Sequence, residues 1–189
     1  MYKRDVLKYN VFDLIPSDFI FLKDNQNYQL IRNNINEFID NSINNHKNKL
    51  ILEVGPKENG DIRFMENNIL ETVDILNNNT TYCADLTKEN NIPKNHFDII
   101  YCLEVLEHTF EPDNILKELY KLLKEEGILY LSVPFDFRIH GPLPDCYRIS
   151  EFGLKYLLEK NNFKIIEFTA LINSERPASP LHYTIVCKK

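Results

Sequence analysis

Apolar residues in this chain fall into short runs that alternate with helical patterns. Apolar positions spaced three and four residues apart predict helices over 28–43, 113–124 and 150–160. The runs expected to form buried strands lie near 50–54, 69–75, 80–84, 97–102, 127–133, 163–171 and 182–187. No helical pattern separates the last two runs, so they are expected to be antiparallel. This order predicts an α/β fold, namely a Rossmann-like, seven-stranded, mainly parallel sheet with helices on both faces and a C-terminal antiparallel hairpin.

The chain of 189 residues is long enough for a single globular unit. Within it, residues 1–48 are expected to form a helical extension or lid, and residues 49–189 the main domain. The net charge of −6 and the lack of a basic cluster disfavour nucleic acid as a partner. No apolar run has the length of a membrane span, and no secretion signal begins the sequence, so a cytoplasmic protein without a membrane partner is expected. The four cysteines show no metal-binding spacing, so no metal is expected.

Three acidic residues occur where expected strands end. Glu53 precedes Gly55 at the end of the first strand, and Asp74 and Asp85 close later runs. The carboxyl ends of parallel strands share one edge of a sheet, and ligands bind there. Glycine also lets the backbone approach a ligand closely. Together these residues predict a pocket for an electron-poor ligand that carries hydroxyl groups.

The fourth strand leads into Leu103-Glu104-Val105-Leu106-Glu107-His108. This segment resembles the class I S-adenosylmethionine-dependent methyltransferases, and within them a group of small methyltransferase domains with a leucine-glutamate-histidine signature after strand four. A helix and the run Gly127–Pro134 follow in the family's order, and Asp145–Ser150 is similar to a Tyr-Arg-Phe-Thr segment of bacterial members. The resemblance covers roughly residues 50–189.

The resemblance implies S-adenosylmethionine as the cofactor, with S-adenosylhomocysteine as product. Glu53 and Gly55 would form the first cofactor turn. Asp74 would accept hydrogen bonds from the ribose hydroxyls, and Asp85 would receive the adenine amine. The full set of residues implied to bind the cofactor is Glu53, Gly55, Pro56, Lys57, Asp74, Ile75, Asp85, Leu86, Cys102, Leu103 and Glu104.

Lys57 departs from the family pattern because it occupies the position of the second glycine. A β-carbon there restricts positive φ angles and narrows the approach to a ligand. Three outcomes are open: a turn remodelled around Gly60, weakened cofactor binding, or a contact from Lys57 to the cofactor carboxylate. The same segment matches a nicotinamide-cofactor fingerprint that has lost its middle glycine, and that loss disfavours a dinucleotide.

Residues 134–148 are expected to bind the acceptor, because they follow the fifth strand at the same edge and mix aromatic with ionisable side chains. The residues expected to contact the acceptor are Phe135, Arg138, His140, Tyr147 and Arg148. His140 is the first choice for a general base. His108 and Tyr147 are the other catalytic candidates, although His108 also suits a structural role.

The function indicated is S-adenosylmethionine-dependent methyl transfer to a small-molecule or sugar-containing acceptor, at oxygen or nitrogen. The competing hypothesis is a catalytically inactive protein that keeps the methyltransferase fold for binding or as a scaffold. The oligomeric state is left open.

Overall fold

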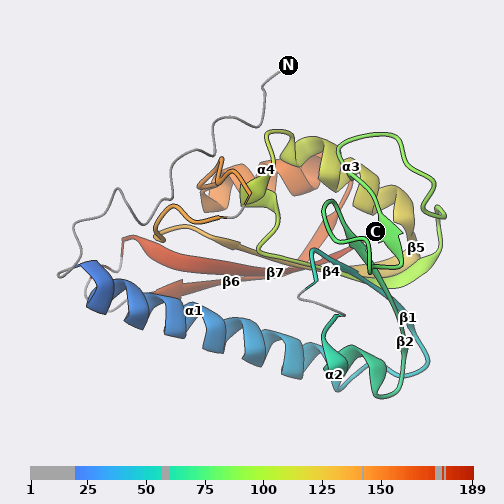
Figure 1. Cartoon of the computed structure of the whole chain (residues 1–189), viewed down its shortest axis with the longest axis horizontal. Coiled ribbons are helices and arrows are strands. Elements are labelled where there is room, and N and C mark those ends of the chain that lie inside the picture. The colour runs from blue at the N-terminus through green and yellow to red at the C-terminus, as the bar shows by residue number, and fades with distance from the viewer. Residues whose placement is uncertain (1–19, 57–59, 142, 173–175, 177) are drawn as a thin grey trace.

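The computed structural model describes residues 20–56, 60–141, 143–172, 176 and 178–189, with side chains from residue 26 onward. Within these residues, seven strands form one sheet, and four α-helices pack on its two faces (Figure 1). The elements are α1 (Ile20–Ile43), β1 (Leu50–Val54), α2 (Ile62–Met65), β2 (Ile69–Asp74), β3 (Tyr82–Cys83), β4 (Phe97–Leu103), the 3₁₀ turn η3 (Leu106–His108), α3 (Pro112–Leu122), β5 (Leu123–Pro134), α4 (Glu151–Lys160), β6 (Lys164–Ile172) and β7 (Pro180–Lys188).

The sheet has the strand order β3-β2-β1-β4-β5-β7-β6. Strands β1 to β5 pair in parallel, whereas β7 pairs antiparallel with both β5 and β6. The predicted fold class and terminal hairpin are therefore confirmed. The chain leaves β1 toward β2 and β3 on one side and returns to β4 on the other. In such sheets ligands usually bind at this reversal, beyond the carboxyl ends of β1 and β4.

Each face of the sheet has its own apolar core, because neighbouring strand residues point to opposite faces. In β1, Ile51 faces α1 and α2, while Leu52 faces α3 and α4. Figure 1 shows α1 running along one face, with α3 and α4 on the other. The apolar stripe of α1 consists of Ile31, Ile35 and Ile39, each no more than 4% exposed.

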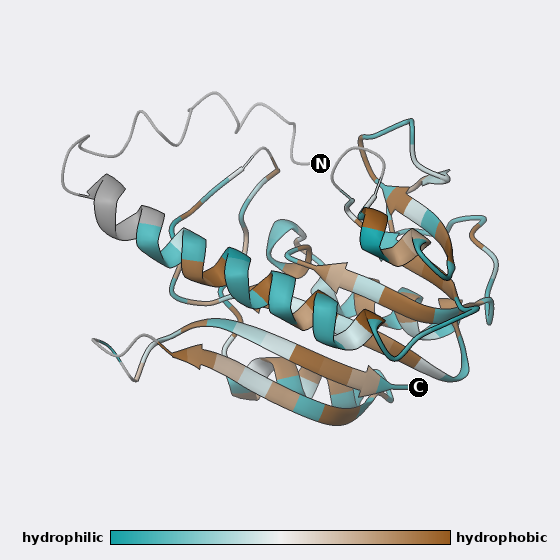
Figure 2. Ribbon diagram, turned by 90° about the horizontal axis from the view of Figure 1, so that it is seen from below, coloured by the Kyte–Doolittle hydropathy of each residue, from teal (hydrophilic) through white to brown (hydrophobic). Residues whose placement is uncertain are grey.

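The helix predicted over residues 28–43 extends back to Ile20. Its face toward the viewer in Figure 2 is mainly hydrophilic, whereas the strands behind it carry mainly hydrophobic residues. The amphipathic pattern is therefore explained by packing on the sheet. Among the described residues, no helix combines the length and apolar character needed to cross a membrane.

Candidate functional site

The turn after β1 is built around two glycines with positive φ angles. Gly55 has φ +65° and Gly60 has φ +94°, a region that favours glycine. The amide of Asp61 donates to Glu53 Oε2 at 2.8 Å, so the strand-tip carboxylate also holds the far end of this turn. Of the open alternatives for this turn, a role for Gly60 fits these angles. Lys57 lies outside the described residues.

Gly60 also lacks space for a side chain. A β-carbon there would lie 2.8 Å from Leu70 Cδ2 and 3.1 Å from Glu53 Oε2. We expect Gly60→Ala to lower the free energy of unfolding by about 1–3 kcal/mol, because it adds a clash to an unfavourable φ. The matched control is Gly141→Ala, whose β-carbon meets nothing closer than 3.7 Å. Chemical denaturation of both variants measures the difference, and equal stabilities would contradict this description of the turn.

The carboxylate of Glu53 has a pKa close to neutral pH. Burial raises the pKa of Glu53 to about 7, and the charge of Asp61 adds to the shift, while the Asp61 amide and Arg63 oppose it. The side chain therefore changes charge near neutral pH. A ligand that presents an ammonium group or hydroxyl donors would favour the ionised form.

Asp74 ends β2 and Asp85 follows β3, so both lie at strand ends, as predicted. Each carboxylate also accepts hydrogen bonds from residues of its own turn. Asp74 Oδ1 accepts from the amides of Leu76 and Asn77 at 2.6 and 2.8 Å, and no described residue bonds its Oδ2. Asp85 uses both oxygens locally, Oδ1 for Thr87 and Oδ2 for Lys88. The geometry thus leaves Asp74 better prepared than Asp85 to receive a ligand hydroxyl.

The apolar candidates differ in what they can offer a cofactor. Cys102 and Leu86 belong to the main core, at 0% and 6% exposure, so Cys102 could offer a cofactor only its backbone. Pro56 is also buried, whereas Leu103 is partly exposed and Ile75 is exposed. Leu103 and Ile75 therefore remain the apolar residues with side chains open to a ligand.

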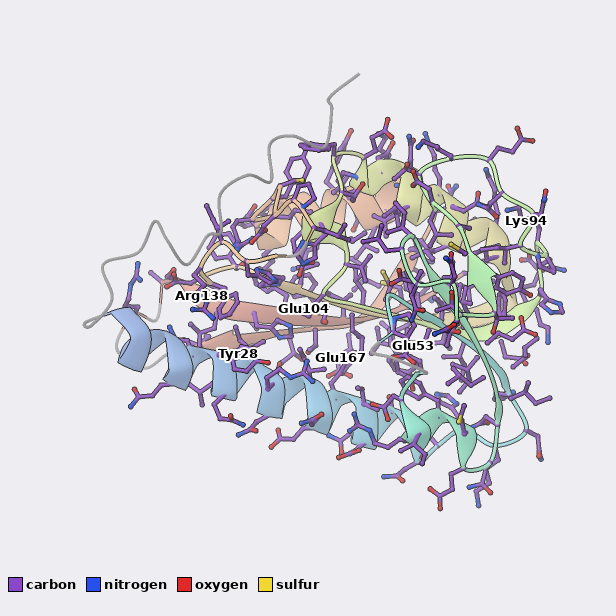
Figure 3. All side chains as sticks on the ribbon, in the orientation of Figure 1. Tyr28, Glu53, Lys94, Glu104, Arg138 and Glu167 are labelled. Carbon is purple, nitrogen blue, oxygen red and sulfur yellow. The ribbon has the colours of Figure 1, made fainter. Side chains whose placement is uncertain are left out.

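Glu104 directly follows β4. It has an uncommon backbone conformation, and its side chain is held by hydrogen bonds. Its φ of +57° is uncommon for a residue with a β-carbon. Glu104 Oε1 accepts from Ser132 Oγ at 2.9 Å and lies 2.7 Å from Nε2 of the fully buried His182. No described residue bonds Oε2. In Figure 3, Glu104 and Glu53 both lie in the centre of the view, between α1 and α3.

The loop of residues 134–148, referred to below as the acceptor loop because it is expected to bind the acceptor, contains an ion pair between a buried carboxylate and a partly exposed guanidinium. Asp145, whose side chain is 1% exposed, pairs with the Arg148 guanidinium at 2.5 and 2.7 Å. Arg148 also donates to the carbonyls of Phe137 and Arg138. Although burial alone would raise the pKa of Asp145, bonds from Arg148 and His140 hold that pKa below its ordinary value. These contacts make Arg148 an anchor of the loop.

The other predicted acceptor residues are divided between the core and the surface. Phe135 packs against Tyr183 at 5.8 Å and covers the main core. Tyr147 is 41% exposed, and its hydroxyl donates to the Phe110 carbonyl at 3.3 Å. Arg138 lies 6.0 Å over the ring of Phe137. Figure 3 shows Arg138 beside Tyr28 of α1, in keeping with the 6.3 Å separation of the Tyr28 and Phe137 rings.

His108 and His140, far apart in sequence, face one another. Their ring centroids are 4.7 Å apart, and both lie beside Glu107 of η3. His108 Nε2 is 3.7 Å and His140 Nε2 is 4.0 Å from Glu107 Oε1. The two predicted histidines are therefore brought together, and the structure adds a buried carboxylate between them. These three side chains could hold a metal ion, which cysteine spacing did not suggest.

Sequence reasoning missed Glu107, Asp145 and His182. Glu107 was noted only as a neighbour of Glu104, although a 3₁₀ turn points its side chain inward. Asp145 was read only as part of a motif. His182 lies in the largely buried strand β7. A histidine within such a strand was the feature of the sequence that could have indicated a role for this residue.

Comparisons with known proteins identify the family of this chain. A family model described as a methyltransferase domain matches residues 24–168. The ubiquinone biosynthesis O-methyltransferase of Histophilus somni is 29% identical over 108 residues, which cover 54% of this chain and 41% of that protein. The chain thus matches less than half the length of this curated relative.

Solved structures share the fold. A methyltransferase from Archaeoglobus fulgidus described as SAM dependent has a TM-score of 0.62 and 14% identity, covering 91% of this chain and all of that one. The Burkholderia thailandensis 1,6-didemethyltoxoflavin-N1-methyltransferase, solved with S-adenosylhomocysteine, has a TM-score of 0.60 and 16% identity, covering 76% and 72%. Because the family model matches most of the sequence, this chain belongs to the methyltransferase-domain family.

Proposed function

We propose that this protein is an S-adenosylmethionine-dependent methyltransferase acting on a hydroxyl group of a small molecule. The observation that carries the proposal is the placement of Glu53, the glycine turn and Glu104 at the carboxyl ends of the paired strands β1 and β4. The family membership supports the reaction class. The curated relatives are named O-methyltransferases, and this name favours oxygen as the acceptor atom. The segment from Glu104 to His108 fits the leucine-glutamate-histidine group of this family.

The hydrogen-bonding groups of the cofactor are complementary to the residues at this edge of the sheet. S-adenosylmethionine, when bound, supplies an electrophilic methyl group on a sulfonium centre. Glu53 offers a carboxylate to its ammonium group, and Asp74 Oδ2 can accept from the ribose hydroxyls. Gly55 and Gly60 let the backbone come close. The chain itself mainly aligns donor and acceptor and keeps water out.

The acceptor would lie between Glu104 and the loop of residues 134–148. The ion pair of Asp145 and Arg148 fixes this loop. Tyr28 of α1 contacts the loop at the ring of Phe137. Helix α1 therefore acts as a cover over the acceptor end of the site. His140 donates from Nδ1 to Asp145 at 2.9 Å, so its Nε2 is the nitrogen that can accept.

We expect Asp74→Ala to weaken S-adenosylhomocysteine binding by about 10–100-fold, because a bond to a charged acceptor contributes roughly 1.5–3 kcal/mol. Titration calorimetry measures the dissociation constant. Asp74→Asn retains an oxygen for the Leu76 and Asn77 amides, so it separates loss of the turn from loss of the charge. The exposed Glu89→Ala is the matched control. Wild-type affinity in Asp74→Ala would contradict the cofactor site.

The alternative is a protein that binds the cofactor without turnover. Methyl transfer from radiolabelled S-adenosylmethionine to a panel of phenols and other small hydroxyl compounds separates the two functions. Binding without transfer to any compound in the panel would favour the binding protein.

A further inference from the structure

Three ligand-type atoms converge beneath the acceptor loop. They come from Glu107, His108 and His140, each of which offers one ligand atom within 4.8 Å of those of the other two. Neighbouring ligands on bonds of about 2.1 Å to one ion lie roughly 3.0–3.4 Å apart. The separations of 3.7 and 4.0 Å from Glu107 are slightly wider than this, so small side-chain rotations would bring all three atoms onto one ion.

The first histidine is locked in the tautomer that a metal needs. Nδ1 of His108 lies 3.2 Å from the Pro144 carbonyl, which can only accept a hydrogen bond, so Nδ1 carries the proton. The lone pair is therefore on Nε2, the atom that faces Glu107.

The second histidine is locked in the same way by a carboxylate. His140 Nδ1 lies 2.9 Å from Asp145 Oδ2, and the His140 amide donates to the same oxygen at 3.0 Å. Because Asp145 is ionised and fixed by Arg148, Nδ1 of His140 donates and Nε2 is left with its lone pair. A carboxylate behind a histidine is the usual support for a metal ligand.

The carboxylate between them is buried without a hydrogen-bond partner. Glu107 is 1% exposed, and none of the described residues donates to either of its oxygens. Buried polar atoms are normally satisfied, so an orphaned carboxylate that faces two lone pairs indicates a missing cation.

We propose that Glu107, His108 and His140 form a binding site for a divalent transition-metal cation. Two imidazoles and one carboxylate suit Zn²⁺, Mn²⁺ or Fe²⁺, whereas Mg²⁺ and Ca²⁺ favour all-oxygen sites. Three protein ligands leave coordination positions open toward the acceptor loop, as in catalytic metal sites. Glu104 lies close enough for its charge to act on both Glu107 and His108, which increases the attraction for a cation.

The role of this site in methyl transfer rests on the proposed function. A hydroxyl acceptor bound to the cation would lose its proton to water more easily, because the metal stabilises the oxyanion. The O–C bond would then form while the S–C bond breaks, and that electron pair would remain on sulfur. His140 would in this case be a metal ligand and would no longer be available as the general base.

The test is a titration of chelator-treated, full-length protein with Mn²⁺, followed by electron paramagnetic resonance of the free ion. Mn²⁺ is chosen because it has little affinity for thiols, and Cys146 is nearby, with its amide 2.6 Å from the Glu107 carbonyl. We expect one Mn²⁺ per chain with micromolar affinity. Glu107→Gln and His140→Ala are each expected to weaken binding at least 100-fold. Asp145→Asn is expected to weaken it about 10–100-fold.

Two controls and one parallel measurement complete the test. Glu118→Gln removes another buried carboxylate, and His96→Ala removes a histidine outside the cluster, so both should leave Mn²⁺ affinity unchanged. Because His140 is in a partly exposed loop, His140→Ala covers the case in which Glu107→Gln fails to fold. The cation site is refuted if wild-type protein binds no Mn²⁺ at 1 mM, or if Glu107→Gln and His140→Ala both bind it like wild type. Binding of S-adenosylhomocysteine to the same metal-free sample reports separately on the proposed function.

Discussion

S-adenosylhomocysteine is expected to bind about tenfold more weakly at pH 6 than at pH 8. The free protein holds Glu53 with a pKa of about 7, so roughly nine-tenths of the side chains are ionised at pH 8 and one-tenth at pH 6. Because the ligand's ammonium and hydroxyl groups favour the carboxylate, binding lowers the pKa of Glu53 and releases a proton. Affinity is therefore complete above pH 8 and falls as the pH drops through 7. Titration calorimetry across this range measures the effect.

Glu53→Gln is the matched variant for this experiment. It keeps an oxygen for the Asp61 amide but cannot ionise, so its affinity should be lower than wild type at pH 8 and nearly independent of pH. A wild-type affinity that stays constant between pH 6 and 8 would show that Glu53 does not meet the ligand.

Asp145→Ala is expected to lower the free energy of unfolding by about 3 kcal/mol. The substitution removes the buried carboxylate of an ion pair and leaves the Arg148 guanidinium without its partner. It also removes the acceptor of the His140 amide and ring. Denaturant unfolding measures the loss.

The matched control is Lys155→Ala, which breaks a more exposed ion pair with Glu151 in α4. Such helix pairs contribute only about 0.3–0.5 kcal/mol. A loss in Asp145→Ala as small as that in Lys155→Ala would mean that the acceptor loop is held by its prolines and aromatic contacts, with little contribution from the ion pair.

Strands and long helices could be predicted because their apolar periodicity is a local property of the sequence. The run at Leu50–Val54 and the stripe of Ile31, Ile35 and Ile39 matched the structure closely. Helix α2 was missed because its four residues are too short for a periodic pattern. The placement of β7 between β5 and β6 depends on pairing across the sheet, which the sequence shows only as a hairpin.

The candidate site residues could be predicted where they lie at the ends of strands. Glu53 and Asp74 lie at the tips of neighbouring strands, as the alternating pattern required. For Cys102 the strand end alone was not informative, because alternation along β4 turns its side chain into the core. The cluster of Glu107, His108 and His140 could not be predicted from spacing, since it depends on how the acceptor loop folds back over η3.

The most direct test of the central claim is the crystal structure of this protein with S-adenosylhomocysteine. We expect the ligand beyond the carboxyl ends of β1 and β4, with its ammonium group beside Glu53 and its ribose hydroxyls on Asp74. A ligand bound elsewhere, or none at millimolar concentration, would contradict the assignment of this edge of the sheet as the cofactor site.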